Sequence, residues 1–358
     1  MILTKKDTKI IKGIAILLMM AHHLFAFPKR MVTGFEFQPF LQVGEISIER
    51  SIGIFGKICV SLYMFLGGYG IYRYVQSGGV LCKRVIKMYQ SYWKVFFVFI
   101  PVGFLFFSNQ PVYCEESVLC NVFSKFNLNE FFCNLIGWKC TYNREWWFFK
   151  TYLCTMFLGY VWIERLKEKR GFFSEVFLVI LLEILIRSIF PAIRNIEIFK
   201  SLGSDVLYSN FFTIDIYCIP FFMGIIFAKY EEIQIVGLLK DIPKWKRKII
   251  SIFGIVLVIY IRNFIFGGWL DLFCVPCFIL FVLELLDSHI ILCNILEFLG
   301  EYSTNMWLIH SFYCYYFYEV AKVIYGAKNS LIDMLVLTGL SLISAIVIEK
   351  MWSQFHSL

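Results

Sequence analysis

The chain is organised as long apolar stretches separated by short charged ones. Ten of these stretches can each cross roughly 30 Å of hydrocarbon at a rise of about 1.5 Å per residue. We expect membrane-spanning helices near residues 10–27, 52–76, 88–108, 145–163, 172–190, 211–229, 248–266, 268–286, 303–325 and 331–352. A short apolar piece at 290–299 is expected at the interface before the ninth span. The pattern predicts an all-α, polytopic integral membrane protein with ten transmembrane helices.

Basic residues cluster in alternate loops, which predicts the orientation. The clusters are the N-terminal lysines and the stretches CKRVIK, ERLKEKRG and KDIPKWKRK. The positive-inside rule places them in the cytoplasm, and ten spans then place both termini there. The loops at 28–51, 109–144 and 191–210 would face outward. We expect one transmembrane domain over residues 1–358, with no appended soluble domain.

Composition supports a membrane location over a soluble one. The chain is 59% hydrophobic and only 17% charged, whereas soluble domains carry about 25% charged residues. Its net charge of +8 is explained by the topology, so we expect the lipid bilayer as a partner and no nucleic acid. The first apolar run lacks a small-residue cleavage site, so it is not expected to be a signal peptide.

Four cysteines fall in the predicted outer loop at 109–144, namely Cys114, Cys120, Cys133 and Cys140. An outward loop is open to oxidation, so one or two disulfides and four thiols are both compatible with the sequence. Their spacing indicates no zinc site, and we predict no metal.

Polar residues within the first span are the strongest chemical signal. On a helix Lys12 and His23 lie on one face, about 16 Å apart along the axis, while His22 points about 100° away. Ionisable groups inside a membrane are costly and usually mark a site. A histidine can take a proton from a hydroxyl at neutral pH, but it can also simply hydrogen-bond a neighbouring helix.

Two further groups of polar residues lie at or within predicted spans. Glu183 and Arg187 are four residues apart, so they share a helix face and can pair. Arg144 and Glu145 precede Trp147 at the outer end of the fourth span. These residues suit either an aromatic belt at the interface or a contact with a sugar.

Several stretches, in order, resemble the membrane-bound acyltransferase-3 family. KGIAILLMMAHHLF places a basic residue eleven positions before a histidine, with Lys12 where the family usually has arginine. ICVSLYMFLGGYGIYRY is similar to the second segment, and CKRVIKMYQSYW supplies Arg84 and Lys87 at the two positions of an Arg-x-x-Arg element. REWWFFKTYL and LGEYSTNMWLIHSF, with His310, are similar to later segments. The resemblance runs from residue 7 to about 312.

The resemblance implies an O-acyltransferase of a bacterial plasma membrane. It implies transfer of an acyl group, most often acetyl, from cytoplasmic acyl-CoA to a hydroxyl of a cell-surface or lipid-linked glycan. Acetyl-CoA would be a donor substrate, with no permanently bound cofactor. The acceptor glycan and its hydroxyl are not specified.

The resemblance also implies roles for particular residues. His23 would be the general base, with an acyl-histidine intermediate left open. His310 is expected in the cytoplasmic third of the ninth span, lining the channel or packing there, and His22 is a second channel or acceptor candidate. The donor-binding candidates are Lys12, Arg73, Lys83, Arg84 and Lys87. Ordinary topogenic charge is the alternative explanation of these basic residues.

The main alternative is a transporter or flippase of a glycan precursor, with histidines relaying protons. It predicts interrupted helices at matching positions in two halves of the chain. Pro101, Pro220 and Pro276 form no such paired pattern.

Overall fold

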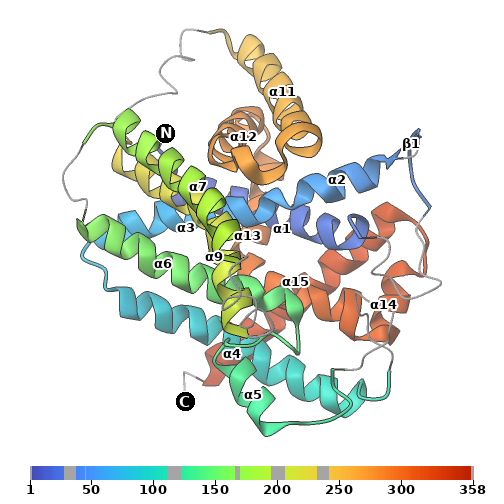
Figure 1. The fold of residues 1–358 in the computed structure, drawn as a ribbon. Helices are drawn as coiled ribbons and strands as arrows, with labels where there is room; N and C mark the ends of the chain where they lie inside the picture. Colours follow the sequence, from blue (N-terminus) through green and yellow to red (C-terminus); the bar gives the residue numbers. More distant parts are fainter. Residues whose placement is uncertain are drawn as a thin grey trace. The chain divides into compact units, whose positions relative to one another are not determined.

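The structure is a computed structural model that describes residues 2–27, 38–44, 46–110, 122–165, 170–194, 206–231 and 242–355. Apart from the paired two-residue strands β1 (Gln42–Val43) and β2 (Ile46–Ser47), its regular elements are helical (Figure 1). The α-helices are α1 (Lys5–Phe25), α2 (Ile48–Gly56), α3 (Ile58–Gln76), α4 (Leu81–Phe106), α5 (Leu128–Leu135), α6 (Trp147–Arg165), α7 (Phe172–Arg194), α9 (Val206–Lys229), α11 (Lys244–Tyr260), α12 (Asp271–Leu286), α13 (Ile290–Ser311), α14 (Tyr318–Tyr325) and α15 (Ser330–Phe355). The all-α prediction is confirmed for this part of the chain.

Five helical segments of the described chain are long and apolar enough to cross a membrane. They are Lys5–Phe25, Ile48–Gln76, Lys244–Ile265, Gly268–Leu286 and Ser330–Gln354. They correspond to the first, second, seventh, eighth and tenth predicted spans, so the multi-pass prediction is confirmed. The count of ten and the cytoplasmic termini stay predictions.

The bounds predicted for the ninth span are wrong. The apolar piece at 290–299 is not a separate interfacial element, because it forms the first half of α13. At its other end α13 passes into a π-helical turn, η6 (Phe312–Tyr316), which is closed by a bond from Phe317 N to Phe312 O of 2.7 Å. His310 therefore lies next to the last residue of α13, away from the helix start where the sequence placed it.

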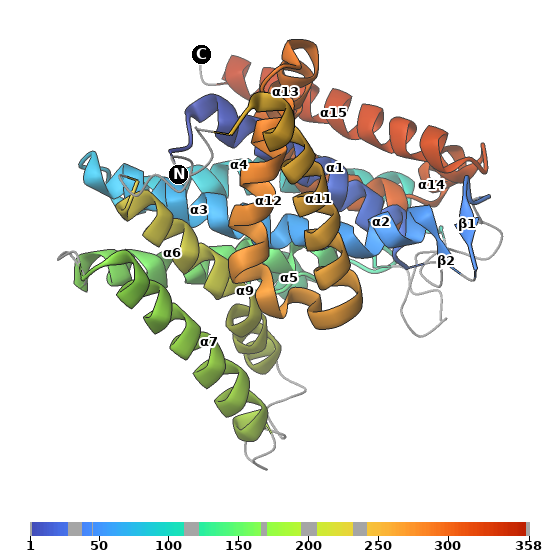
Figure 2. The same cartoon turned by 90° about the horizontal axis from the view of Figure 1, so that it is seen from above.

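Contacts divide the chain into two compact units. Unit 1 comprises Met1–Ile11, Val60–Val85 and Trp147–Ile295, and unit 2 comprises Lys12–Cys59, Ile86–Trp146 and Leu296–Leu358. In unit 1, α9 packs against α6 and α7. Figure 2 shows α11 and α12 of the same unit side by side. A second π-helical turn, η4 (Ile261–Phe266), and the 3-10 helix η5 (Gly267–Leu270) join these two helices.

Buried polar side chains in unit 1 hydrogen-bond one another. The Arg262 guanidinium donates to Asp271 over 2.9 Å, and the Ser61 hydroxyl donates to the same carboxylate over 2.6 Å. On α7, Arg187 Nε donates to Glu183 over 2.9 Å, which confirms the pairing expected from their spacing. Paired charges avoid the large cost of a lone buried ion, so these contacts let charged residues lie inside an apolar bundle.

In unit 2, two glycines bring other helices close to α1. A Cβ atom added at Gly13 would lie 2.1 Å from the Leu296 carbonyl oxygen on α13. A Cβ added at Gly56 on α2 would lie 2.3 Å from the Leu18 carbonyl oxygen. Only a residue without a side chain allows these backbone approaches, which are typical of helices packed in membranes. α13 thus approaches α1 closely at Gly13, and α2 approaches it closely at Leu18.

The predicted outer loop at 109–144 contains a structured segment. Residues 122–144 are described and include α5. The Tyr92 hydroxyl of α4 donates to the Asn134 carbonyl at the end of α5 over 2.6 Å. Cys133 is a thiol that donates to Asn129 over 3.7 Å, so it forms no disulfide with Cys140. Cys114 and Cys120 lie outside the described residues.

Candidate functional site

The centre of the candidate site is the half-buried imidazole of His23 near the C-terminal end of α1. Its Nδ1 lies 3.2 Å from the hydroxyl of Tyr315, which η6 carries. The same hydroxyl donates to the His23 carbonyl oxygen over 2.5 Å. That carbonyl belongs to the last turn of α1, where carbonyl groups lack partners within the helix. Tyr315 thus holds both the ring and the backbone of His23.

His310 lies beside His23, and this contact was not predicted from the sequence. The centroids of the two rings are 4.9 Å apart, with their planes inclined by 52°. The His310 side chain is 0% exposed, and its Nδ1 donates to the Trp307 carbonyl oxygen over 2.7 Å. A carbonyl only accepts, so Nδ1 carries the hydrogen and Nε2 carries the lone pair. Within the described residues, His310 Nε2 has no hydrogen-bond partner.

His22 faces α2, in keeping with the angle predicted between it and His23. Its Nδ1 donates to the Gly53 carbonyl oxygen over 2.7 Å. The ring also makes edge contacts with His23 at 5.3 Å and with Phe27 at 4.9 Å. This is the interhelical hydrogen bond that the sequence left open as an explanation for a histidine in a span.

Lys12 and His23 are both part of the continuous helix α1, so the structure supports their shared face. Eleven residues of α-helix separate them by about 16 Å along the axis. The side chain of Lys12 is half-buried. The eleven-residue spacing between the basic residue and the histidine, on which the resemblance depends, therefore lies within one helix.

The donor-binding candidates are distributed over both units. Arg73, Lys83 and Arg84 belong to unit 1, and Lys12 and Lys87 to unit 2. Arg73 donates to Glu231 over 2.7 Å, and the same carboxylate accepts a bond from the Tyr69 hydroxyl.

Of the other basic side chains in this group, Arg84 contacts an aromatic ring, whereas two lysines are exposed. The Arg84 guanidinium lies over the ring of Tyr74, 5.2 Å from its centroid. Lys83 and Lys87 are exposed.

The residues predicted at the outer end of the fourth span differ in their burial and in their contacts. Glu145 is buried in unit 2, where it accepts a hydrogen bond of 3.2 Å from the hydroxyl of Tyr316. The Arg144 backbone N–H donates to that hydroxyl over 2.8 Å, and the Arg144 side chain is exposed. Trp147 belongs to unit 1 and lies 5.1 Å from the ring of Tyr217.

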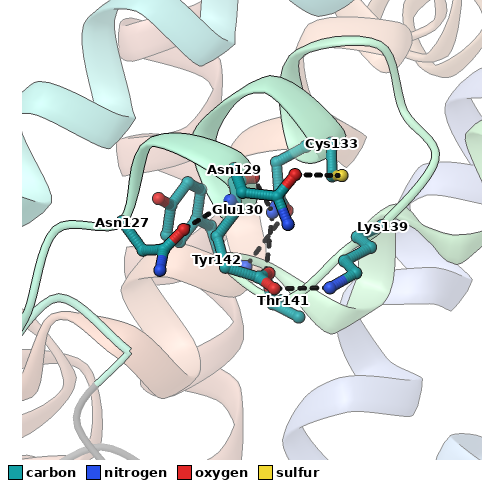
Figure 3. A network of polar contacts seen from close by, with 8 residues as sticks. Asn127, Asn129, Glu130, Cys133, Lys139, Thr141 and Tyr142 are labelled. Carbon is teal, nitrogen blue, oxygen red and sulfur yellow. Dashed lines mark hydrogen bonds and ion pairs between the residues drawn. The ribbon is translucent and has the colours of Figure 1, made fainter.

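A polar network stabilises the segment around α5 (Figure 3). Asn127 caps the helix by accepting from the Glu130 backbone N–H over 3.0 Å. The Glu130 carboxylate accepts from Lys139 over 2.5 Å and from Thr141 over 2.8 Å. The bond from Lys139 is the main cause of a lowered pKa at Glu130. These contacts tie α5 to the segment at residues 139–141 that follows it.

Tyr315 is the residue of this site that sequence reasoning missed. It lies in the aromatic run SFYCYYFYE directly after His310. The run indicates aromatic packing. Which of its rings contacts His23 depends on the π-helical turn, which the sequence pattern does not predict.

A comparison with protein families identifies the family to which the chain is similar. The family model described as an acyltransferase domain, of the acyltransferase-3 family, matches residues 7–350. Neither the curated proteins nor the solved structures contain a significant match to the chain.

Proposed function

Because the chain belongs to the acyltransferase-3 family, we propose that it is an integral membrane O-acyltransferase. It moves an acyl group, acetyl in the simplest case, from cytoplasmic acyl-CoA to a hydroxyl of a cell-surface or lipid-linked glycan. It acts in the plasma membrane of a bacterium. The observation that carries the proposal is the pair of imidazoles, His23 and His310, with ring centroids 4.9 Å apart.

In the proposed reaction His23 is the general base. Its Nε2 takes the proton of the acceptor hydroxyl, and the hydroxyl oxygen attacks the thioester carbonyl carbon. The carbon–sulfur bond then breaks, and the leaving CoA thiolate takes the proton back from His23. An imidazole is suited to both proton transfers because its ordinary pKa is near 6.5.

His310 supports the cation that forms on His23 during the reaction. Its Nε2 lone pair is available because it lacks a partner within the described residues. A neutral acceptor beside the developing imidazolium stabilises that charge without competing for the proton in the resting enzyme. The His310 side chain is 0% exposed, so water does not compete for its Nε2 lone pair.

The basic residues would bind the donor. The phosphates of CoA carry negative charge, and guanidinium and ammonium groups bind phosphate through charge-assisted hydrogen bonds. Arg73 is already ordered by Glu231, so a phosphate arriving there would share or replace that contact. The remaining donor-binding residues of the proposal are Lys12, Lys83, Arg84 and Lys87.

The residues near the outer end of α6 would meet the acceptor. Arg144 is exposed and Trp147 is partly exposed, so both can contact a sugar. Glu145 is buried on Tyr316, and its role would be to position that segment. His22 would have a similar supporting role, because its Nδ1 is engaged by Gly53.

The test is an assay of label transfer in isolated membranes. Membranes containing the wild-type protein are incubated with radiolabelled acetyl-CoA, and the glycan fraction is counted. We expect His23→Gln to abolish the label in the glycan, while the exposed residue His289 supplies a matched control, His289→Gln, that keeps it. Size-exclusion profiles in detergent confirm that both variants are folded. Wild-type labelling by a folded His23→Gln protein would overturn the proposal.

A further inference from the structure

The Tyr315 hydroxyl makes two contacts with the same residue, and its single hydrogen can serve only one of them. The oxygen lies 2.5 Å from the His23 carbonyl oxygen and 3.2 Å from His23 Nδ1. Two oxygens at 2.5 Å require a hydrogen between them, and the carbonyl cannot supply it. The tyrosine hydrogen is therefore directed at the carbonyl.

This arrangement determines the tautomer of His23. With its hydrogen committed to the carbonyl, the tyrosine oxygen can only accept from Nδ1. Nδ1 is then the protonated nitrogen, and the lone pair of the neutral ring is on Nε2. His310 has the same tautomer for a similar reason, because the Trp307 carbonyl accepts from its Nδ1.

We propose that Tyr315 is a positioning residue that holds His23 in the Nδ1–H tautomer, so that Nε2 is ready to accept a proton. The inference rests on the proposed function, in which His23 Nε2 is the base. A histidine ring in water favours the opposite form, with the hydrogen on Nε2, and that form cannot take a proton at Nε2. The tyrosine thus reverses the intrinsic preference of the ring, as second partners of functional histidines commonly do.

The π-helical turn η6 explains how Tyr315 reaches this position. The bond from Phe317 N to Phe312 O spans five residues, so the turn is wider than an α-helical one. A wider turn changes the direction in which each following side chain leaves the helix. Such turns occur often at functional sites, and here the turn directs the hydroxyl of Tyr315 to the end of α1.

The chain offers a matched control within the same turn. The Tyr313 hydroxyl is hydrogen-bonded to the hydroxyl of Ser344 at 2.6 Å. Tyr313→Phe and Tyr315→Phe each remove one hydrogen-bonded hydroxyl from η6. Only Tyr315→Phe removes a contact with His23.

The first measurement is the ¹⁵N spectrum of the full-length protein in detergent with ¹⁵N-labelled histidine. The chain has five histidines, and a His23→Gln sample identifies the signals of His23. We expect the Nδ1–H form of His23 in the wild type and in Tyr313→Phe, and mainly the Nε2–H form in Tyr315→Phe. An unchanged tautomer in Tyr315→Phe, or the Nε2–H form in the wild type, would overturn the inference.

The second measurement is the rate of acetyl transfer. Losing one hydrogen bond shifts a tautomer ratio by about tenfold. We expect kcat of Tyr315→Phe to fall by about tenfold, KM for acetyl-CoA to stay within about twofold, and Tyr313→Phe to retain the wild-type rate. Equal rates in the two variants would contradict a role through His23. Failure of the proposed function appears separately, as an active His23→Gln protein, and leaves the tautomer measurement valid.

Discussion

His310→Leu tests whether the buried histidine is retained for function at a cost in stability. Leucine is close to histidine in size, so the substitution leaves no large cavity. A buried polar atom without a hydrogen-bond partner costs about 1–3 kcal/mol, and His310 Nε2 is such an atom within the described residues. The lost bond from Nδ1 to the Trp307 carbonyl is worth about 1 kcal/mol. The two contributions predict a variant that is as stable as the wild type or up to about 2 kcal/mol more stable.

Activity is expected to change in the opposite direction. Removing a group that stabilises the developing charge on His23 should lower kcat by about 100-fold. Thermal unfolding in detergent gives the stability, and label transfer from acetyl-CoA to the glycan gives the rate, both on the same preparation. A variant that loses more than about 2 kcal/mol would show that His310 serves packing. A stable variant with the wild-type rate would refute the role assigned to Nε2.

Two further predictions concern charged groups. Arg73→Ala should raise KM for acetyl-CoA by about tenfold with kcat unchanged, because a phosphate contact binds the ground state and the transition state equally. The control is Lys244→Ala, which also removes an exposed basic residue from an ion pair. Equal KM values for the two variants in initial-rate assays would exclude a donor contact at Arg73. Glu130 has a pKa lowered below 4.5 by the bond from Lys139, so its contribution to stability is present above that value and is lost as the pH falls through the lower folded pKa. The unfolding midpoint of Glu130→Gln should therefore lie below that of the wild type at pH 7, and the difference should shrink towards pH 3; a difference that grows in acid would contradict the assignment.

Hydropathy locates the apolar part of the first span but not the polar turn with which its helix begins. The sequence predicts a span that starts at residue 10, whereas α1 begins at Lys5, directly after Thr4, whose side chain bonds to Asp7. The Thr4 hydroxyl donates to the Asp7 carboxylate over 2.6 Å, and the Asp7 backbone N–H donates to the Thr4 hydroxyl over 3.1 Å. A cap of this kind extends a helix by polar residues, which lower its mean hydropathy. Its position is therefore predicted from local sequence motifs and not from hydropathy.

The ninth span shows where hydropathy fails. Glu297 and Glu301 interrupt the apolar pattern of α13, so the sequence divided one helix into an interfacial piece and a later span. A helix tolerates such residues, since glutamate has a good helix propensity. The pattern is also uninformative about η6, because aromatic residues suit an α-helix and a π-helical turn equally. The contact between His310 and His23 depends on the full length of α13 and on the π-helical turn that follows it. The resemblance therefore identifies the two histidines but not their contact.

The different burial of the two imidazoles supports assigning the base to His23. A general base must come within hydrogen-bonding distance of the hydroxyl it deprotonates. His23 keeps part of its surface exposed, whereas His310 is 0% exposed. The two rings also differ in what holds Nδ1, since a backbone carbonyl can only accept, while a tyrosine hydroxyl accepts only as long as its hydrogen is engaged elsewhere. His310 therefore has its lone pair on Nε2 whatever happens at the site, and it suits the fixed role of an acceptor. His23 depends on Tyr315 for the same state, so the ring that meets the acceptor is also the ring whose tautomer a single side-chain oxygen controls.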